Sequence, residues 1–447
     1  MTDRGFIMKK GFEKKVFQIA IPVALQSMFQ SSFSMIDQIM VGQLGESSIA
    51  AVEIAGKPGF IYAFVTGAIG TIAGIQISQY IGKKDRAAEE KSICINTVTM
   101  LVTAIAFLVG FVIFAQKFAS LFSSDEAVIA DACKYLRIIV WTFIPLGISN
   151  ICGVAIRCRG KSSWPLYVGF FSAVINTTLN YGLIFGRLGL PELGVRGAAI
   201  ASVISQIASA GIILTLFFRL YGKIRLSANL GKAGLLQYLS MLVPVVVNEF
   251  LWSVGQSVNT YVYGHMGTDE LAGMSITGSV QGLTIGALSG LSQAAGILIG
   301  NRLGEGEYEK AYEESKKLCV YGIIGSLILS GVIVILRFPY TNIYNVSGDV
   351  KAVGAGILVA FAFLMPIKVQ NMILGGGIIR SGGKTKYIMI IDILGTWLIG
   401  VPLALFTGLY LRLPIVWVYF LLSQEELVRF VISVFMFRSR KWMNTID

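Results

Sequence analysis

The chain has 447 residues, of which 55% are hydrophobic and only 14% are charged, against roughly 25% charged residues in an average soluble domain. This composition excludes a soluble enzyme and a disordered chain. Five cysteines without a CxxC pair and a single histidine argue against a disulfide scaffold, a His-based zinc site and a Ser-His-Asp triad. The net charge of +12 comes from basic residues between apolar segments, which indicates membrane topology rather than nucleic-acid binding.

Twelve stretches are long and apolar enough to cross a membrane, since a span needs about 20 mostly apolar residues. They cover residues 14–42, 48–81, 92–116, 127–156, 163–186, 195–218, 233–264, 270–300, 311–336, 350–379, 387–410 and 413–437. The charged start of the chain runs into the first stretch without a small-residue cleavage site, so we expect no removable signal peptide. The sequence therefore predicts an all-α, multi-pass membrane protein.

Lysine and arginine are distributed unequally between the two sides of the predicted membrane. The termini and the connections on their side carry 26 of these residues, whereas the connections on the opposite side carry 6. Because basic residues concentrate in cytoplasmic connections, we expect both termini to be cytoplasmic, which requires an even number of spans.

The second half of the sequence repeats features of the first at a shift of 222 residues. Pro22 falls on Pro244, and RCRGKS at 157–162 later resembles RSGGKT at 380–385. Matched prolines, glycines and loop charges argue against shared apolar composition as the cause. We predict two parallel six-helix lobes, residues 1–225 and 226–447, with a cleft between them of the kind found in alternating-access transporters.

The first span contains Asp37, an acid with no basic residue within two turns of it in sequence. A charge near the bilayer centre costs at least ~2.5–3.5 kcal/mol, so it usually has a partner or a task. The repeat places Asn259 at the equivalent position of the second half, so only one half carries the acid. We interpret Asp37 as a carrier of H⁺ or Na⁺, although a structural hydrogen-bond acceptor is the alternative.

The fifth span contains Asn176 and Asn180, which lie one helical turn apart and share a face. Their oxygens could complete a Na⁺ shell beside a carboxylate. Asparagine also joins membrane helices to one another by hydrogen bonds, so the pair alone does not specify a site.

The second half holds further ionisable residues within its spans. Glu249 has no local cation, Asp392 lies near the predicted cytoplasmic interface, and Lys368 needs a carboxylate from another helix, for example Glu249. These residues are candidates for coupling or substrate binding, with a structural role as the alternative. Two pairs spaced four residues apart are expected to be structural: Glu53 with Lys57, and Glu425 with Arg429.

Two short motifs, GKS at 160–162 and GKT at 383–385, resemble the end of a phosphate-binding loop. Ala155 and Ile378 stand where such a loop requires its first glycine, so both motifs are better interpreted as glycine turns after spans. With no sign of ATP binding, we expect an ion gradient to supply the energy. A potential of 100 mV is worth about 2.3 kcal/mol per charge moved.

Three segments carry a family resemblance: IPVALQSMFQSSFSMIDQIMVGQLG, LNYGLIFGRLGLPELGVRGAAIASVIS and GGGIIRSGGKTK. They are similar to segments of multidrug and toxic compound extrusion (MATE) transporters, and the likeness extends over the whole chain. The stretch LGVRGAAIAS is the most specific part. The resemblance implies a cation-coupled antiporter that exports organic, usually cationic and amphipathic compounds, and that works as a monomer in a bacterial-type plasma membrane.

The resemblance also assigns residues. Asp37 matches the family's acid in the first span, Asn176 its span 5 asparagine, and Asn180 the position where one branch has a second aspartate. With Ser202, which stands where many members have threonine, they resemble a binding site for Na⁺ or H⁺. In the second half, Glu249 is on the matching helix about a turn away, while Val369 occupies the position of the family's span 10 acid.

We expect the drug to bind among aromatic and methionine side chains, and the ion to reach Asp37 from outside, so that the first span bends near Pro22 or repacks. The predicted partners are small organic cations and membrane lipid, with no nucleic acid and no cofactor beyond the ion. A flippase for lipid-linked precursors is the alternative, disfavoured because only Lys368 offers a cavity cation. An intramembrane enzyme is disfavoured because His265 lies at a loop edge.

Overall fold

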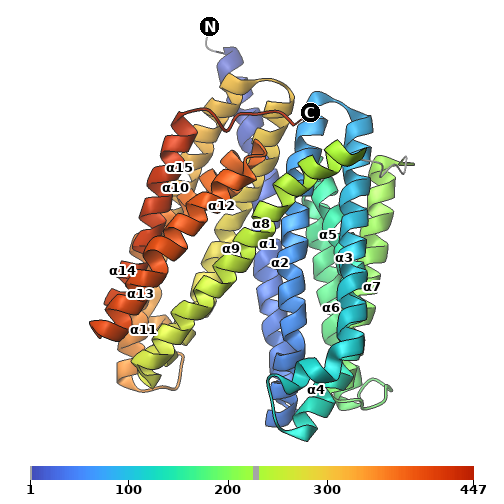
Figure 1. The fold of residues 1–447 in the computed structure, drawn as a ribbon, viewed down its shortest axis with the longest axis vertical. Coiled ribbons are helices and arrows are strands. Elements are labelled where there is room, and N and C mark those ends of the chain that lie inside the picture. The colour runs from blue at the N-terminus through green and yellow to red at the C-terminus, as the bar shows by residue number, and fades with distance from the viewer. Residues whose placement is uncertain (1–2, 225–230, 447) are drawn as a thin grey trace. The chain divides into compact units, whose positions relative to one another are not determined.

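The computed structural model describes residues 3–224 and 231–446, which form helices joined by short turns, with no strand among them (Figure 1). The first part contains α1 (Asp3–Gly42), α2 (Glu46–Lys83), α3 (Arg86–Ser120), α4 (Glu126–Ile139), η1 (Val140–Thr142), α5 (Phe143–Cys158), α6 (Ser163–Phe185) and α7 (Val195–Tyr221). The second contains α8 (Gly231–Met266), α9 (Thr268–Gly304), α10 (Tyr308–Thr341), α11 (Gly348–Asn371), η2 (Met372–Ile379), α12 (Thr385–Ile393), η3 (Leu394–Gly400), α13 (Val401–Leu405), η4 (Phe406–Tyr410), α14 (Ile415–Leu422) and α15 (Gln424–Arg438).

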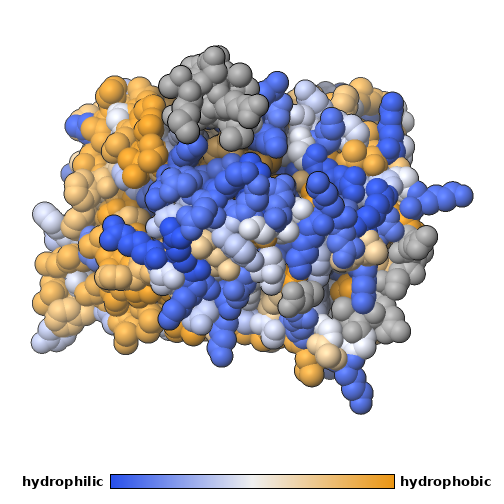
Figure 2. All heavy atoms as spheres, turned by 90° about the horizontal axis from the view of Figure 1, so that it is seen from above, coloured by the Kyte–Doolittle hydropathy of each residue, from blue (hydrophilic) through white to orange (hydrophobic). Residues whose placement is uncertain are grey.

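The predicted all-α membrane fold is confirmed, with one difference in the number of uninterrupted spans. Eleven helical stretches among the described residues are long and apolar enough to cross a membrane. The twelfth expected span, 413–437, is divided at Ser423 into α14 and α15, and each half alone is too short. Seen from the helix ends, hydrophilic residues gather over much of one face and hydrophobic residues border it (Figure 2).

The chain divides into two compact units, and two long helices contribute to both. The N-unit comprises Leu25–Ile77 and Asp85–Leu230, and the C-unit comprises Met1–Ala24, Ser78–Lys84 and Gly231–Asp447. The boundary within α1 therefore falls two residues after Pro22, a residue that removes a helix hydrogen bond and permits a bend.

Close backbone contacts explain why the first part of α1 belongs to the C-unit. A Cβ atom on Gly290 of α9 would collide with the backbone of Ala20, so only glycine allows this approach. The end of α2 is held in the same unit by Gln79, whose amide donates to the Ser381 carbonyl at 2.7 Å and accepts from the Ile446 amide at 2.7 Å.

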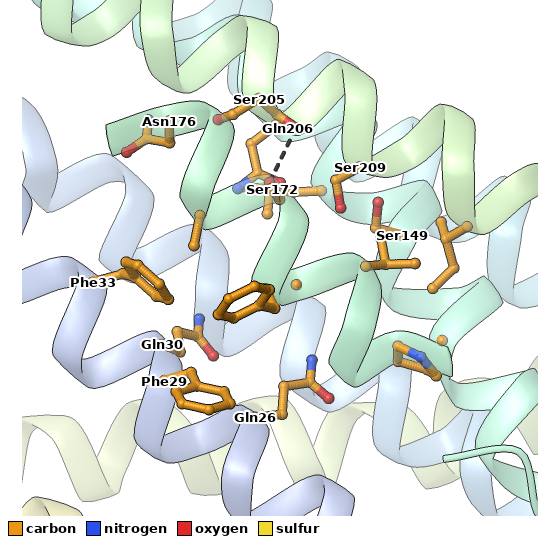
Figure 3. A pocket seen from close by; sticks show the side chains of 18 of the residues that line it. Gln26, Phe29, Gln30, Phe33, Ser149, Ser172, Asn176, Ser205, Gln206 and Ser209 are labelled. Atoms are coloured by element: carbon orange, nitrogen blue, oxygen red, sulfur yellow. Dashed lines mark hydrogen bonds between the residues drawn. The ribbon is translucent and has the colours of Figure 1, made fainter. Parts of the chain in front are cut away.

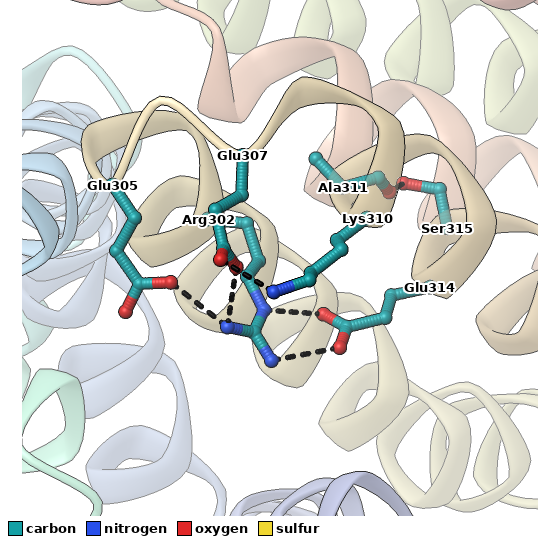
Figure 4. Close-up of polar contacts among 7 residues, drawn as sticks. All are labelled: Arg302, Glu305, Glu307, Lys310, Ala311, Glu314 and Ser315. Atoms are coloured by element: carbon teal, nitrogen blue, oxygen red, sulfur yellow. Dashed lines mark hydrogen bonds and ion pairs between the residues drawn. The ribbon is translucent and has the colours of Figure 1, made fainter. Parts of the chain in front are cut away.

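The turn between α9 and α10 is fixed by Arg302. Its guanidinium donates two hydrogen bonds of 2.9 Å to Glu314 and further bonds to Glu305 at 2.8 Å and Glu307 at 2.9 Å (Figure 4). Outside the spans, the hydrogen bond from Lys310 is the main reason that the pKa of Glu307 lies below its usual value. Several charges around one guanidinium make this a network rather than an isolated surface pair.

In the N-unit, α6 packs along α7, and α5 contacts both α7 and α3. Tyr62 donates to the Phe143 carbonyl at 2.7 Å, which ties α2 to α5. The predicted pair of Glu53 and Lys57 is confirmed, with 3.3 Å between Nζ and Oε1, and both side chains are exposed. In this scaffold one face of α1 contacts α6, and the same face lines a cavity together with α5, α6 and α7.

Candidate cation and substrate site

Four side chains that the sequence marks as a cation site meet in the N-unit. Asn180 donates from Nδ2 to Asp37 Oδ1 at 2.8 Å and to Asn176 Oδ1 at 3.2 Å. Asn176 in turn donates from its Nδ2 to Ser202 Oγ at 3.3 Å. Residues from α1, α6 and α7 thus form one continuous hydrogen-bonded chain, and the described donor to Asp37 is a neutral amide.

The local sequence explains how the chain of bonds is positioned. Asn176 and Asn180 lie on one face of α6 because residues four apart are neighbours on a helix. That face points towards α1 and α7, and Asn180 is only 1% exposed. One turn earlier on α6, Ser172 donates to the Ser205 carbonyl at 3.1 Å, which fixes the register of α6 against α7.

A cavity of about 430 Å³ within the N-unit extends from this cluster (Figure 3). Its wall combines apolar and aromatic side chains such as Phe29 and Phe33 with a large number of polar groups. The polar lining residues are Gln26, Gln30, Ser34, Asp37, Ser149, Asn150, Arg157, Ser172, Asn176, Ser202, Ser205, Gln206 and Ser209. Small-molecule sites are usually concave and mostly apolar with a few directed polar groups, so this concave cavity is more polar than a typical one.

A second polar region lies in the C-unit and is built around Arg429 of α15. Its guanidinium lies 3.7 Å from Asp392, 3.8 Å from Glu425 and 4.0 Å from Glu426. Asn248 of α8 donates to the other oxygen of Asp392 at 2.7 Å. The predicted pairing of Glu425 with Arg429 is confirmed, but the arginine also joins an acid from α12, which the sequence alone did not indicate.

The remaining C-unit candidates occupy two positions. Lys368 lies 3.7 Å from Glu426, so a carboxylate from another helix faces it as expected, although this acid is Glu426 and not Glu249, the example suggested above. Asn248, the residue before Glu249 on α8, is the one that bonds to Asp392. Asn259 lines a smaller cavity of about 210 Å³ together with Lys368 and Glu426. The structure thus brings Asn259 and Lys368 together in one cavity, and it joins Asp392 to α8 through Asn248.

Two π-helical segments, η2 and η3, contact α15, the helix that carries Arg429, Glu425 and Glu426. Asn371, just before η2, donates to Glu426 Oε2 at 2.8 Å, and Arg429 also donates to Thr396 in η3. In η3, a Cβ atom on Gly395 would lie 2.5 Å from Nε of Arg429. π segments are rare and are frequent at functional sites, so these charges lie in an unusual part of the bundle.

Sequence reasoning missed several residues of the N-unit cavity. Gln26, Gln30 and Asp37 are spaced along one face of α1 at helical intervals, and this periodicity was a usable signal. Arg157 was counted among the cytoplasmic loop charges, yet its side chain lines the cavity. Asn150 had no sequence signal, because a single amide in an apolar span resembles a helix-packing contact.

Comparisons with known proteins agree with this architecture. A model of the MatE family matches the chain twice, over residues 22–182 and 244–406, so the two matches start at the 222-residue shift of the internal repeat. The chain is 23% identical over 441 residues to the probable multidrug resistance protein NorM of Thermotoga maritima, covering 96% of this chain and 93% of that protein.

Two further similarities extend over most of the chain. It is 26% identical over 419 residues to the probable multidrug resistance protein YoeA of Bacillus subtilis, covering 89% of this chain and 88% of that protein. Among solved structures, the Vibrio cholerae MATE transporter VcmN matches with a TM-score of 0.88 and 17% identity, covering 97% of this chain and 99% of that chain. The structural match shows that the two proteins share a fold.

Proposed function

The chain belongs to the MatE family of membrane transporters, and from this premise we propose that it is a cation-coupled antiporter that exports organic compounds across a bacterial plasma membrane. The relatives described as multidrug resistance proteins support small amphipathic compounds as its substrates. The N-unit cavity is the proposed substrate site, and the C-unit ion cluster is a candidate second site for coupling.

The observation that carries the proposal is the position of Asp37. Its carboxylate belongs to a predicted membrane span, accepts a hydrogen bond from the amide of Asn180, and also lines the 430 Å³ cavity. An acid with this double contact can respond both to a cation and to a substrate. Binding of one then changes the affinity for the other, which is the requirement for coupling.

The orientation of the amides favours H⁺ as the coupling ion. Asn180 directs its N–H groups at Asp37 and at Asn176, so a proton can add to the carboxylate with both amides in place. A Na⁺ ion at Asp37 would instead need the amide oxygen of Asn180 turned towards the carboxylate, because amide hydrogens repel a cation.

The proposed cycle uses the helix that contributes to both units. Protonation of Asp37 removes a charge from the C-terminal part of α1, and α1 changes unit between Ala24 and Leu25, just after Pro22. A bend of α1 at this point would make the conformation of the cavity depend on whether Asp37 is protonated. Coupling requires that the ion bind one conformation of the transporter more tightly than the other, since equal binding would leave the populations of the two conformations unchanged.

The test is efflux of a fluorescent cationic dye from proteoliposomes under a pH gradient or a Na⁺ gradient, imposed separately. We expect the pH gradient to drive efflux in the wild type and not in Asp37→Asn. The exposed Asp349, substituted as Asp349→Asn, is the matched control and should behave as the wild type. Equal efflux in wild type and Asp37→Asn would refute the role of Asp37, and lipid movement without dye movement would replace the antiporter with the flippase.

A further inference from the structure

The segment Ser439–Ile446, here called the tail, is bonded to the end of α2 that belongs to the C-unit. The backbone amide of Ile446 donates to Gln79 Oε1 at 2.7 Å, and Gln79 Nε2 donates to the Asn444 carbonyl at 3.1 Å. Lys83, one turn further along α2, donates to the Ile446 carbonyl. Gln79 is completely buried. Three hydrogen bonds from the last three residues of the tail, its tip, thus hold the end of α2.

The other end of the tail, its root, is anchored without α2. Trp442 is completely buried, and its indole N–H donates to the Phe437 carbonyl at 3.1 Å. Arg440 forms an ion pair with Glu309 near the start of α10. A Cβ atom on Gly382 would collide with the Trp442 carbonyl, so only glycine allows the tail to lie there. The tail therefore has a fixed root and a tip that reaches another helix.

Beneath the tip, the end of α2 packs on α9 through glycines. A Cβ atom on Gly82 would collide with the Asn301 carbonyl, and one on Gly304 would collide with the Gln79 carbonyl. Small residues let helices approach closely, and at these two points the contact is with the partner's backbone. Separation there requires no interlocked side chains to disengage, so the hydrogen bonds of the tip are the specific restraint on this end of α2.

The internal repeat provides a comparison within the same chain. At the shift of 222 residues, Gln79 corresponds to Asn301 and Lys83 corresponds to Glu305. Asn301 Oδ1 is buried without a partner among the described residues, and Glu305 pairs with Arg302. The bonds to the tail are therefore an addition to the first half and are not required by the repeated helix packing.

The two helices that contribute to both units differ where they change unit. α1 does so just after Pro22, which permits a bend. α2 does so between Ile77 and Ser78, and its proline, Pro58, lies about five turns earlier. Sharp bends arise mostly at proline or similar interruptions, so α2 is expected to pass the boundary as a rigid rod. Movement of the N-unit against the C-unit, which alternating access requires, therefore acts directly on the end of α2.

We propose that the tail is a releasable latch. With the tip docked, the end of α2 is held in the C-unit, and release of the tip lets that end leave the C-unit while Arg440 and Trp442 keep the root in place. This inference rests on the proposed function for the movement of the two units. It goes beyond that function, because it identifies a segment outside the substrate and ion sites whose release is a step of transport.

The first test measures how often the end of α2 detaches, in phosphatidylcholine nanodiscs without substrate or gradient. Ser78 is completely buried, so the thiol of Ser78→Cys should react with a maleimide only after detachment. Labelling at this position is followed by mass spectrometry. Deletion of residues 444–447 removes the tip and should raise the labelling rate at least about tenfold, the smallest effect expected from three hydrogen bonds. An unchanged rate would overturn the proposal.

Substitutions on α2 check that the lost bonds are the cause. Gln79→Met with Lys83→Met removes the bonds from the other side and should raise the labelling rate as the deletion does. Lys84→Met removes the exposed neighbouring charge and should keep the wild-type rate. An equal increase in Lys84→Met and in the deletion variant would overturn the proposal. If the double variant does not fold, the deletion still decides.

The second test asks whether release of the tip is needed for transport. Lys84→Cys and Thr445→Cys flank the bond between Lys83 and Ile446, and a flexible methanethiosulfonate cross-linker between the two cysteines locks the tip. We expect this lock to stop dye efflux from proteoliposomes and reduction with dithiothreitol to restore it.

A matched lock on the root is the control. The same cross-linker between Arg440→Cys and Glu309→Cys replaces the ion pair of the root and should leave efflux at the rate of the unlocked protein. Equal efflux with either lock would overturn release of the tip as a step of transport. If no variant moves dye under either gradient even before cross-linking, the antiporter proposal fails, while the labelling rates still decide whether the tail is a latch.

Discussion

The substitution Arg429→Met should destabilise the C-unit strongly. The cluster holds three carboxylates, Asp392, Glu425 and Glu426, and two basic groups, Arg429 and Lys368. The side chains of Glu425 and Glu426 are each only 9% exposed. Removing one partner from a buried ion pair costs about 3–5 kcal/mol, because the remaining charge is left without compensation. We therefore expect a loss of about 3 kcal/mol or more in the free energy of unfolding.

The measurement is reversible unfolding by sodium dodecyl sulfate in dodecylmaltoside micelles, followed by tryptophan fluorescence. The double variant Arg429→Met with Glu425→Gln removes one acid together with the base, and it should recover at least half of the loss. As a control, Lys57→Met breaks an exposed pair and should cost less than about 1 kcal/mol. A loss below about 1 kcal/mol for Arg429→Met would refute the claim that its charge compensates buried acids.

Three further predictions concern single contacts. Asn180→Ala removes the described donor to Asp37 and should slow efflux driven by a pH gradient about tenfold in proteoliposomes, whereas wild-type rates would contradict the bond's role. Gly395→Ala places a methyl group against Arg429 and should cost about 1–3 kcal/mol in the same unfolding assay; a neutral result would show that the guanidinium moves aside freely. Arg302→Gln leaves the acids of the α9–α10 turn facing one another, so its thermal midpoint should fall and the deficit should shrink in high salt, while a deficit independent of salt would argue against electrostatics.

The sequence predicted those features that depend on local pattern. Apolar length located the spans, and helical spacing placed Asn176 and Asn180 on one face, where the structure joins them to Asp37 and Ser202. Their role in binding a cation stays a prediction. The division of the last span at Ser423 could not be predicted, because the residues of that span are apolar enough for one continuous helix. The break lies next to an ion cluster that α15 forms with other helices, and those contacts are not visible in the sequence.

Contacts between distant segments were beyond prediction from one sequence. Arg429 was expected to pair within its own helix, and spacing gives no information about Asp392, which comes from another helix. Lys368 was expected to need a carboxylate from another helix, but the sequence could not say which one; Glu249 was the example, and the structure pairs it with Glu426. The position of Arg157 was missed because a basic residue at a helix end normally faces water, and only the fold shows that its side chain turns back into a cavity.

The central claim, that Asp37 couples substrate movement to an ion, is tested most directly by running the exchange in reverse. Proteoliposomes with no pH gradient and no Na⁺ gradient are given an inward gradient of a cationic dye, and the internal pH is followed with a trapped indicator. Because coupling is reciprocal, dye entry through the wild type should drive protons outward and raise the internal pH, and Asp37→Asn should abolish that change. Dye entry through the wild type with no change in internal pH, or the same change in Asp37→Asn, would contradict the account.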